Sequence, residues 1–414
     1  MTILQSQPFY NGLLVAIALI AVLLLTRRKL RRSELWQATL TPLSSIIGSG
    51  FLVMAPLLAS IVGLWAPVVI CGIVLLAYSI GSVIRFNIMH VAPQTQERHG
   101  FLNLHDLDYV GKIVLVIAYV IAVAFYLELL SSFSLNYIGI DDPFLERCVT
   151  TSIIVFIGLV GYLKGLSGLE KLEMFAMTLQ LAVLSALIVG LLVYSVTAFE
   201  DGVTVVANES NSVNTKVRML AGVLLIVQGF ETSRFLGEKY VPAIRVQSMR
   251  IAQWISGAVF IGSVALLMPV VQTMNLIEIN LAEIVVALTP VAVVLPVILM
   301  VAAVLSQFSA AVADTGGGGG LLAENSAQRV TTRFGYVCVC VSSILLVWAV
   351  ELLEIIALAS RAFAAYYLIQ TIIALVVNQR SVQDRTLLFW LRQVFFSAIA
   401  LILVYIVAFS IPVE

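Results

Sequence analysis

Apolar runs long enough to cross a lipid bilayer recur along almost the whole chain. The 414 residues are 61% hydrophobic and only 11% charged, and the apolar runs follow one another from residue 9 to residue 411. A hydrocarbon core of about 30 Å takes about 20 apolar residues in a helix, which satisfies its own backbone hydrogen bonds there. The sequence therefore predicts an all-α polytopic membrane protein.

We expect twelve transmembrane helices. The first apolar run, about residues 9–26, is followed by RRKLRR, whereas a secretory signal carries its positive charges before the apolar run, so we expect a retained leading helix. Eleven further apolar runs are named core helices one to eleven. Their expected spans are about 37–60, 64–86, 112–135, 148–163, 170–197, 216–236, 247–272, 284–312, 333–350, 353–377 and 386–410.

The distribution of basic residues supports this count. With the N-terminus outside, the inner segments hold 19 of the 23 Lys and Arg residues, and Arg147, Lys216, Arg218 and Arg361 are the other four. This bias agrees with the positive-inside rule and places both termini outside, most simply in the cell (inner) membrane. We expect residues 1–36 to form the leading helix and a basic linker, and 378–414 the final helix.

The connecting segments leave no room for a soluble enzyme domain or a nucleic-acid-binding module. The four cysteines show no disulfide or metal-binding spacing, and we expect no metal and no cofactor. The run Gly316–Gly320 is followed by Leu-Leu rather than by the Lys-Ser or Lys-Thr of a phosphate-binding loop, so it is interpreted as a hinge or linker at the inner end of core helix eight. The expected partners are a small-molecule substrate and membrane lipid, and the oligomeric state is unknown.

Two of the predicted helices carry glycines near the middle of the membrane. In core helix one the segment IIGSGFLVMAP places Gly48 and Gly50 11 and 13 residues after residue 37, at a depth of about 17–20 Å. Core helix six, which runs in the opposite direction, contains LIVQGFETSRF with Gly229 at a similar depth. Small residues also mark close helix contacts, so a packing face is the alternative for either glycine segment alone.

Two interrupted helices at matching depth are typical of transporters built from inverted repeats. Unwinding frees N–H groups that suit an anion and C=O groups that suit a cation. We therefore expect a five-plus-five inverted repeat, with residues 37–197 as the first repeat and 216–377 as the second. The substrate site is expected at the two breaks and nearby aromatic residues: Ile47, Gly48, Ser49, Gly50, Phe51, Tyr126, Gln228, Gly229 and Phe230.

Several segments resemble the amino acid–polyamine–organocation (APC) superfamily. IIGSGFLVMAPLLASIVGLWAP is similar to its first helix, and QGFETSRFLGEKYVPAIRVQSMRIA to its sixth helix and the loop that follows. YLKGLSGLEKLEMFAMTLQLAVL and SQFSAAVADTG resemble the fifth and eighth helices, so the resemblance covers about residues 37–410. The leading helix is an addition to the pattern. The resemblance implies a permease that works by alternating access, and not an enzyme.

Four charged residues inside or beside the membrane segments are candidates for proton transfer or gating: Glu128, Glu231, Arg234 and Arg361. Glu128 is expected to face a cavity or a partner, because a carboxylate there costs about 3 kcal/mol on insertion scales. Glu231 and Arg234 are three residues apart and are expected to pair. Arg361 is expected to reach the interface or to pair with Glu128, Glu351 or Glu354. Each residue also has a purely structural interpretation.

The coupling ion is inferred from two departures from relatives that the chain resembles. Sodium-coupled relatives carry a hydroxyl pair on helix eight, and the matching segment here, about 295–304, has none. Some proton-coupled relatives carry a lysine in helix five, where this chain has Gln180. Asp314 is expected to be solvated at the inner end of helix eight. Proton coupling would then use Glu128 or Glu231, and Glu128 is favoured because Arg234 would hold Glu231 ionised.

The sequence thus predicts a secondary transporter of a small polar organic solute, an amino acid or an amine, that is proton-coupled or an exchanger. One alternative is a transporter of an inorganic ion or another small metabolite. The other is a membrane sensor or subunit that keeps the scaffold without transporting.

Overall fold

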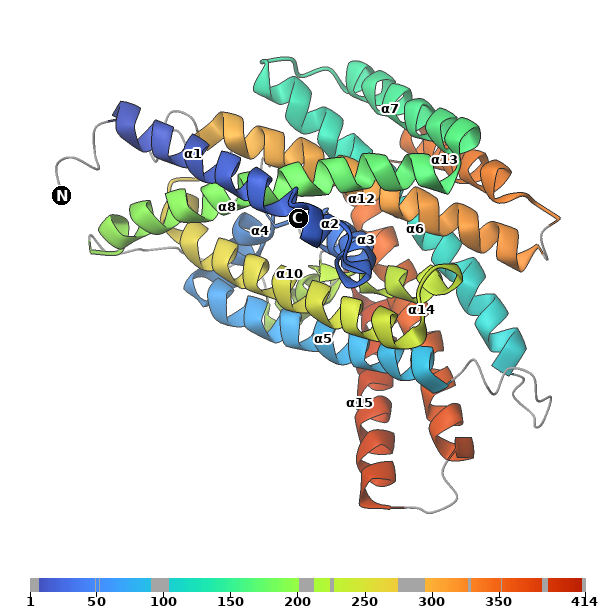
Figure 1. The fold of residues 1–414 in the computed structure, drawn as a ribbon. Helices are drawn as coiled ribbons and strands as arrows, with labels where there is room; N and C mark the ends of the chain where they lie inside the picture. The colour runs from blue at the N-terminus through green and yellow to red at the C-terminus, as the bar shows by residue number, and fades with distance from the viewer. Residues whose placement is uncertain are drawn as a thin grey trace.

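The computed structural model describes residues 7–48, 50–51, 53–90, 104–200, 212–223, 227–274, 295–326, 329–350, 352–381 and 386–411. Helices account for nearly all of these residues, and no strand occurs among them. The fold class expected from the apolar runs is therefore observed in this part of the chain (Figure 1).

The first half of the chain forms eight α-helices and a short 3₁₀ helix, η1 (Gly63–Trp65). The α-helices are α1 (Gln7–Leu25), α2 (Arg28–Arg31), α3 (Glu34–Gly48), α4 (Met54–Val62), α5 (Ala66–His90), α6 (Leu104–Tyr137), α7 (Pro143–Lys164) and α8 (Leu166–Glu200). The second half contains α9 (Val213–Val223), the 3₁₀ helix η3 (Phe230–Glu238), α10 (Pro242–Val271), α12 (Leu295–Asn325), α13 (Thr332–Ala349), α14 (Leu352–Ser381) and α15 (Leu387–Phe409).

Within the described residues, nine helical segments are long and apolar enough to cross a membrane. They correspond to the unbroken core helices, with α4 and α5 counted as one segment. The other three expected crossings are the leading helix α1 and the two segments that the glycines interrupt. The total of twelve, the inverted-repeat layout and the beginning of core helix eight, which falls outside the described residues, stay predictions.

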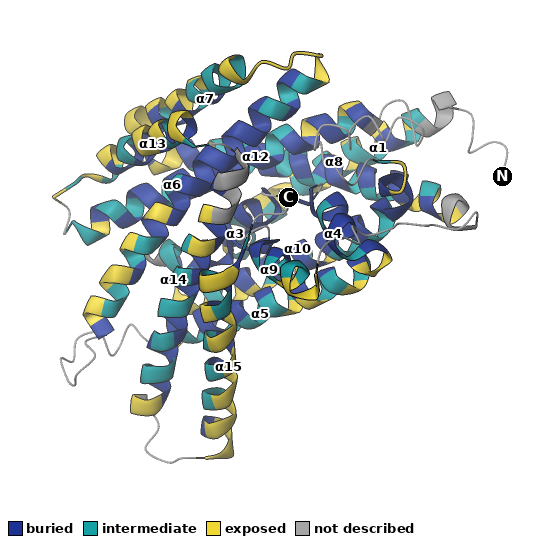
Figure 2. Cartoon of the chain, turned by 180° about the vertical axis from the view of Figure 1, so that it is seen from behind, coloured by how far each residue is buried: buried dark blue, intermediate teal, exposed yellow. Residues whose placement is uncertain are grey.

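Helices α6 and α12 cross at the centre of the bundle, and α3, α8 and α14 pack around them (Figure 1). Side chains are buried over 78% of the most apolar window of α6, against 22% for α15 and 28% for α7. Figure 2 shows the same division, with buried residues dark blue on the central helices and exposed residues yellow on α7, α13 and α15. The outer helices therefore present their apolar side chains to lipid.

Local signals define several helix ends at the rim of the bundle. Asp142 precedes α7, and its carboxylate accepts hydrogen bonds from the N–H groups of Phe144 and Leu145. Pro143 occupies the first helical position, where its missing N–H costs nothing. Thr331 caps α13 in the same way. Each capping side chain satisfies an N–H group that would otherwise lack a partner.

The run Gly316–Gly320 is not a hinge or linker, so that interpretation of the sequence is wrong. The run lies inside α12, which continues to Asn325. A Cβ atom on Gly317 would lie 3.0 Å from the ring of Tyr119, and one on Gly318 would lie 3.0 Å from Val339. The glycines therefore let α6 and α13 approach α12 closely, which outweighs the low helix propensity of glycine.

We expect Gly319→Ala to destabilise the protein, because the added Cβ would collide with the Tyr336 ring and lie 2.8 Å from the Tyr336 backbone nitrogen. Overpacking of this kind costs about 1–3 kcal/mol. Gly320→Ala is the matched control, because no atom of the described residues lies within 4 Å of its added Cβ. Thermal unfolding of the purified variants in detergent checks this. Two variants with the melting temperature of the native chain would contradict the packing role.

Candidate functional site

The first interruption lies between α3 and α4. Helix α3 continues through Ile47 and ends at Gly48, α4 begins at Met54, and Gly50 and Phe51 lie in turns. The Ser306 hydroxyl of α12 lies 3.0 Å from the carbonyl oxygen of Ile47 and 3.1 Å from that of Gly48. It therefore hydrogen-bonds carbonyl groups that the end of α3 leaves without an intrahelical partner.

Gly48 also serves the packing role that was the alternative to a break. A Cβ atom on Gly48 would collide with the Ala310 side chain and lie 3.0 Å from the Ser306 carbonyl oxygen, so α3 approaches α12 closely at this point. The helix end and the close contact thus use the same glycine. Ser49 lies outside the described residues, and Phe51 is buried in the turn.

The second interruption lies between α9 and η3. Gln228 and Gly229 are not helical, and Gly229 has φ +116°, a conformation that side chains other than glycine rarely adopt. The segment after the break, η3, is a 3₁₀ helix rather than the α-helix that the sequence favours. The predicted break is therefore present, and the half-helix that follows it is more tightly wound.

The two interruptions lie against each other. A Cβ atom on Gly229 would lie 2.5 Å from the Ser45 hydroxyl oxygen and 2.7 Å from the backbone nitrogen of Ile46. Gly229 therefore places the backbone of the second break directly on the last turns of α3. Only glycine fits, both because of its positive φ and because of this close approach.

Glu231 is the charged residue of this contact. Its side chain is fully buried, and Oε2 accepts hydrogen bonds from the Gly229 N–H at 3.1 Å and the Tyr367 hydroxyl at 2.6 Å. Oε1 has no hydrogen-bond partner among the described residues. An ionised buried carboxylate normally has several donors or a cation, so this oxygen is available to a ligand or a proton.

Aromatic and amide side chains surround Glu231. The Gln228 side chain donates to the Tyr126 hydroxyl at 3.1 Å, which brings these two predicted residues together. Phe230 stacks on Tyr367 with 5.1 Å between ring centroids and 15° between planes. Tyr367 was not predicted as a site residue. It is one of two adjacent tyrosines in the apolar run AFAAYYLIQ, and nothing in their spacing indicates a binding site.

The expected pairing of Glu231 with Arg234 is wrong. Arg234 instead lies 2.5 Å from Asp108 on α6, and Asp108 also lies 3.1 Å from Lys112. Lys112 in turn lies 2.5 Å from Glu324 at the end of α12. In the tighter winding of η3, Arg234 reaches α6, so no described basic side chain pairs with Glu231.

Glu128 and Arg361 do not join the two breaks. Glu128 is buried on α6, where its charged neighbours are Arg147 and Glu146. It follows Tyr126 by two residues, and residues two apart on a helix do not share a face, so it points away from Gln228. Arg361 donates to the Ser410 carbonyl oxygen at 2.9 Å rather than to Glu128. The side chains of Glu351 and Glu354 fall outside the described part of the chain.

Two serine hydroxyls lie on α12 just beyond the segment 295–304, in which the sequence has none. Ser306 and Ser309 lie just after 295–304, and both bond Gln180 of α8: Gln180 Nε2 donates to Ser306 at 2.8 Å, and the Ser309 hydroxyl donates to Gln180 Oε1 at 3.2 Å. The i, i+3 spacing in SQFSAAVADTG was the available signal. The Gln180 amide therefore joins α8 to the end of α3 through Ser306.

Asp314 is not solvated, so the expectation that it lies in water at the inner end of core helix eight is wrong. Because α12 extends to Asn325, Asp314 lies well inside the bundle, and its side chain is fully buried. The Ser45 hydroxyl donates to Oδ1 at 2.9 Å, and Oδ2 has no partner among the described residues.

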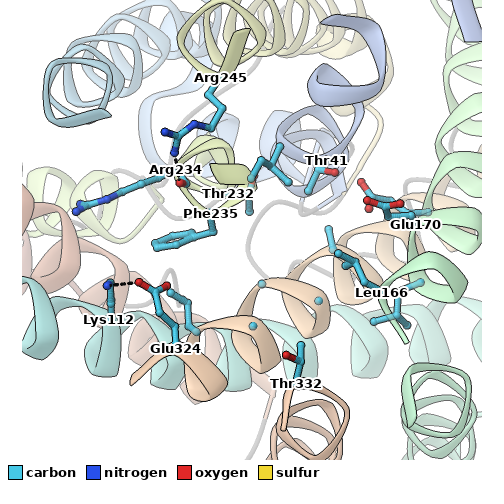
Figure 3. Close-up of a pocket in the computed structure, with 18 of the residues that line it drawn as sticks. Thr41, Lys112, Leu166, Glu170, Thr232, Arg234, Phe235, Arg245, Glu324 and Thr332 are labelled. Carbon is cyan, nitrogen blue, oxygen red and sulfur yellow. Dashed lines mark hydrogen bonds and ion pairs between the residues drawn. The ribbon is translucent and has the colours of Figure 1, made fainter. Parts of the chain in front are cut away.

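A cavity of about 580 Å³ lies beside the break region (Figure 3). Residues near the ends of α5, α6, α8, α10, α12 and α13 line it, and these ends adjoin the basic connecting segments, so we call this side the basic end of the bundle. The polar and charged lining residues are Thr41, Asn87, Asp108, Lys112, Glu170, Glu173, Thr232, Arg234, Arg245, Glu324 and Thr332.

One ion pair at the basic end joins α8 to the segment after η3. Lys239 Nζ lies 3.0 Å from Glu170 Oε1. Partial burial works against the charged ammonium, but the hydrogen bond and charge of Glu170 outweigh it and raise the pKa of Lys239. Both side chains are partly exposed, so the pair contributes little to stability.

The comparisons with known proteins agree with this architecture. A family model described as "APC superfamily transporter" matches residues 28–410. An "Uncharacterized protein" of Aquifex aeolicus (strain VF5) is 40% identical over 388 residues, which cover 93% of each chain. A solved structure described as "Substrate-bound outward-open state of a Na+-coupled sialic acid symporter reveals a novel Na+-site" matches with a TM-score of 0.53 over 97% of each chain, at 12% identity.

The family match and the fold together define an integral, multi-pass helical membrane protein of the secondary-transporter class. The chain belongs to the APC superfamily of transporters.

We expect Gly229→Ala to destabilise the protein more than Gly139→Ala does. Both glycines have positive φ, which costs alanine about 1–3 kcal/mol, but only Gly229 lies against a second backbone. In the described part of the chain, nothing lies within 4 Å of a Cβ added to Gly139, so this variant measures the conformational cost alone. Melting temperatures in detergent check the difference. Equal losses in the two variants would show that the breaks are not in contact.

Proposed function

We propose that the chain is a secondary active transporter of an amino acid or an amine, and that the substrate binds between the two interrupted helices. The observation that carries this proposal is Glu231, whose buried Oε1 lacks a partner among the described residues at the point where the breaks meet. A substrate ammonium group would supply the missing counter-charge. Alternating access would expose this position first to one side of the membrane and then to the other.

The second polar group of an amino acid has a candidate partner in α4. This helix begins beside the first break without a side-chain cap, and the N-terminus of a helix favours a carboxylate. An amino acid would therefore direct its ammonium group to Glu231 and its carboxylate to the start of α4. Tyr126, Phe230 and Tyr367 would cover the apolar part of the substrate.

We propose proton coupling through Glu231 rather than Glu128. The preference for Glu128 rested on a Glu231–Arg234 pair, and Arg234 is instead engaged by Asp108. Sodium coupling is disfavoured because Ser306 already hydrogen-bonds the carbonyl oxygens of Ile47 and Gly48 and is held by Gln180. These contacts already occupy the carbonyl oxygens that a sodium ion at the end of α3 would otherwise bind.

The alternatives are transport of an inorganic ion or another small metabolite, and a sensor or subunit that does not transport. Among the described residues, no group of three or more His, Cys, Asp or Glu side chains is placed to hold a metal ion, which favours an organic solute. For the membrane placement we propose the cell (inner) membrane with both termini outside. A tag at Met1 should be accessible from outside intact cells, and a tag accessible only from the cytoplasm would contradict this orientation.

The experiment begins with a thermal-shift screen of the purified chain against amino acids, amines and organic acids. A bound compound at about 100 times its Kd should stabilise the protein by about 2.7 kcal/mol. We expect an amino acid or an amine to stabilise it, and an organic acid without an amino group to have no effect. If no compound in the panel shifts unfolding and none is taken up, the chain is not a transporter of this class.

In reconstituted vesicles, we expect uptake of the stabilising compound to follow an imposed pH gradient and to ignore sodium. Glu231→Gln should reduce this accumulation by about tenfold or more, because the amide neither binds a proton nor pairs with an ammonium group. Glu128→Gln is the matched control and should accumulate substrate like the native chain. Sodium-dependent uptake, or loss of the pH drive in the Glu128 variant alone, would contradict the assignment.

A further inference from the structure

Two buried carboxyl groups besides Glu231 have no role in the site as described. Asp314 on α12 is fully buried, and Glu173 on α8 is 5% exposed. Like Glu231, each has one carboxyl oxygen without a hydrogen-bond partner in the described part of the chain. A buried carboxyl that serves only to hold the fold would have both oxygens bonded. Glu128 also has one such oxygen, but Arg147 is among its charged neighbours.

No described cation balances these acids. The charged neighbours of Asp314 are the acids Glu231 and Glu173. Glu231 faces the hydroxyl groups of Tyr367 and Tyr119. Glu173 faces Thr41, and the nearest charges are Glu170 and Lys239, which pair with each other.

Three ionised carboxylates in this arrangement would repel one another without a counter-charge, so the arrangement favours bound protons. The acids are also not gathered around one point, because the described residues contain no group placed to hold a metal ion.

Helix α3 connects the three acids. Ser45 donates to Asp314 and lies against Gly229, whose N–H group donates to Glu231. Thr41 precedes Ser45 by one helical turn on the same face, and its hydroxyl faces Glu173. Two hydroxyl groups on one face of α3 thus stand beside successive acids.

The series of three acids, Glu231, Asp314 and Glu173, ends at the cavity. Thr41 and Glu173 both line the cavity at the basic end of the bundle, and Thr41 is labelled there in Figure 3. Asp314 does not line the cavity, although its neighbours Ala313 and Gly316 do. Glu173 is therefore the acid of the series that water in the cavity can reach, and Glu231 is the acid at the two breaks.

We propose that protons pass between Glu231 and the cavity through Asp314 and Glu173, with the Ser45 and Thr41 hydroxyls as relays. In each transfer an O–H bond breaks on the donor acid and one forms on the acceptor, while a relaying hydroxyl accepts one proton and gives up its own. The last proton goes from Glu173 to water in the cavity. The route rests on the proposed function, because it gives the proton at Glu231 its path to the basic end.

The test uses the full chain in liposomes of phosphatidylethanolamine and phosphatidylglycerol, with a tritiated mixture of the protein amino acids and putrescine as probe. Exchange at equal pH on both sides needs no net proton movement, whereas accumulation under a pH gradient does. We expect Glu173→Gln and Asp314→Asn to reduce accumulation by about tenfold or more and to keep exchange within about twofold of the native chain. Glu173→Asp, which keeps an acid, should restore part of the accumulation.

Glu170→Gln is the matched control. Glu170 lies three residues before Glu173 on α8 and lines the same cavity, but it is paired with Lys239. This variant should exchange and accumulate the probe like the native chain. Accumulation by Glu173→Gln at the native level, or equal loss of exchange and accumulation, would overturn the route. A native chain that exchanges none of the probe would contradict the proposed function itself.

A second measurement needs no substrate, and a second variant, Thr41→Val, keeps the route testable if Glu173→Gln fails to fold. Infrared spectra of the native chain should show the carbonyl absorption of protonated carboxyl groups near neutral pH, and a folded Glu173→Gln variant should lose part of it. Thr41→Val, which removes a relay but no acid, should keep the absorption and slow accumulation. An unchanged absorption in Glu173→Gln, or undiminished accumulation in Thr41→Val, would overturn the route.

Discussion

Backbone groups that leave the helical path inside a membrane need partners within the protein, and this requirement organises the whole site. The Ser306 hydroxyl satisfies the carbonyl oxygens at the end of α3, and the Glu231 carboxylate accepts from the Gly229 N–H group. Gly229 lies against Ser45 and Ile46 at distances that exclude any side chain. Partners within the protein therefore satisfy polar groups at both breaks, and one carboxyl oxygen of Glu231 remains for a ligand or a proton.

The contacts of η3 tie the site to two different parts of the bundle. Phe230 and Glu231 contact Tyr367 on α14, whereas Arg234 pairs with Asp108 on α6 at the basic end. Any movement of η3 relative to these helices has to break a buried hydrogen bond or an ion pair. A substrate that replaces the hydrogen bond between Glu231 and Tyr367 would shift the balance between conformations. Water that solvates the Arg234–Asp108 ion pair would do the same.

The fold class and both breaks could be predicted, because apolar length and glycines at mid-membrane depth are local properties of the sequence. The partners of Arg234 and Asp314 could not be predicted, because they depend on how η3 winds and where α12 ends. The run Gly316–Gly320 was misinterpreted for a related reason. Glycine favours flexible segments in isolation, but here Tyr119 and Tyr336 occupy the space that side chains would fill. Packing against α6 and α13 thus outweighs the low helix propensity of the five glycines.

The most direct test of the central claim is a cryo-electron microscopy structure of the chain in lipid nanodiscs with an amino acid or amine that stabilises it. The account predicts ligand density between the end of α3 and η3, with an amino group within hydrogen-bonding distance of Glu231. Continuous helices through residues 47–50 and 228–230, or ligand density away from both breaks, would contradict it.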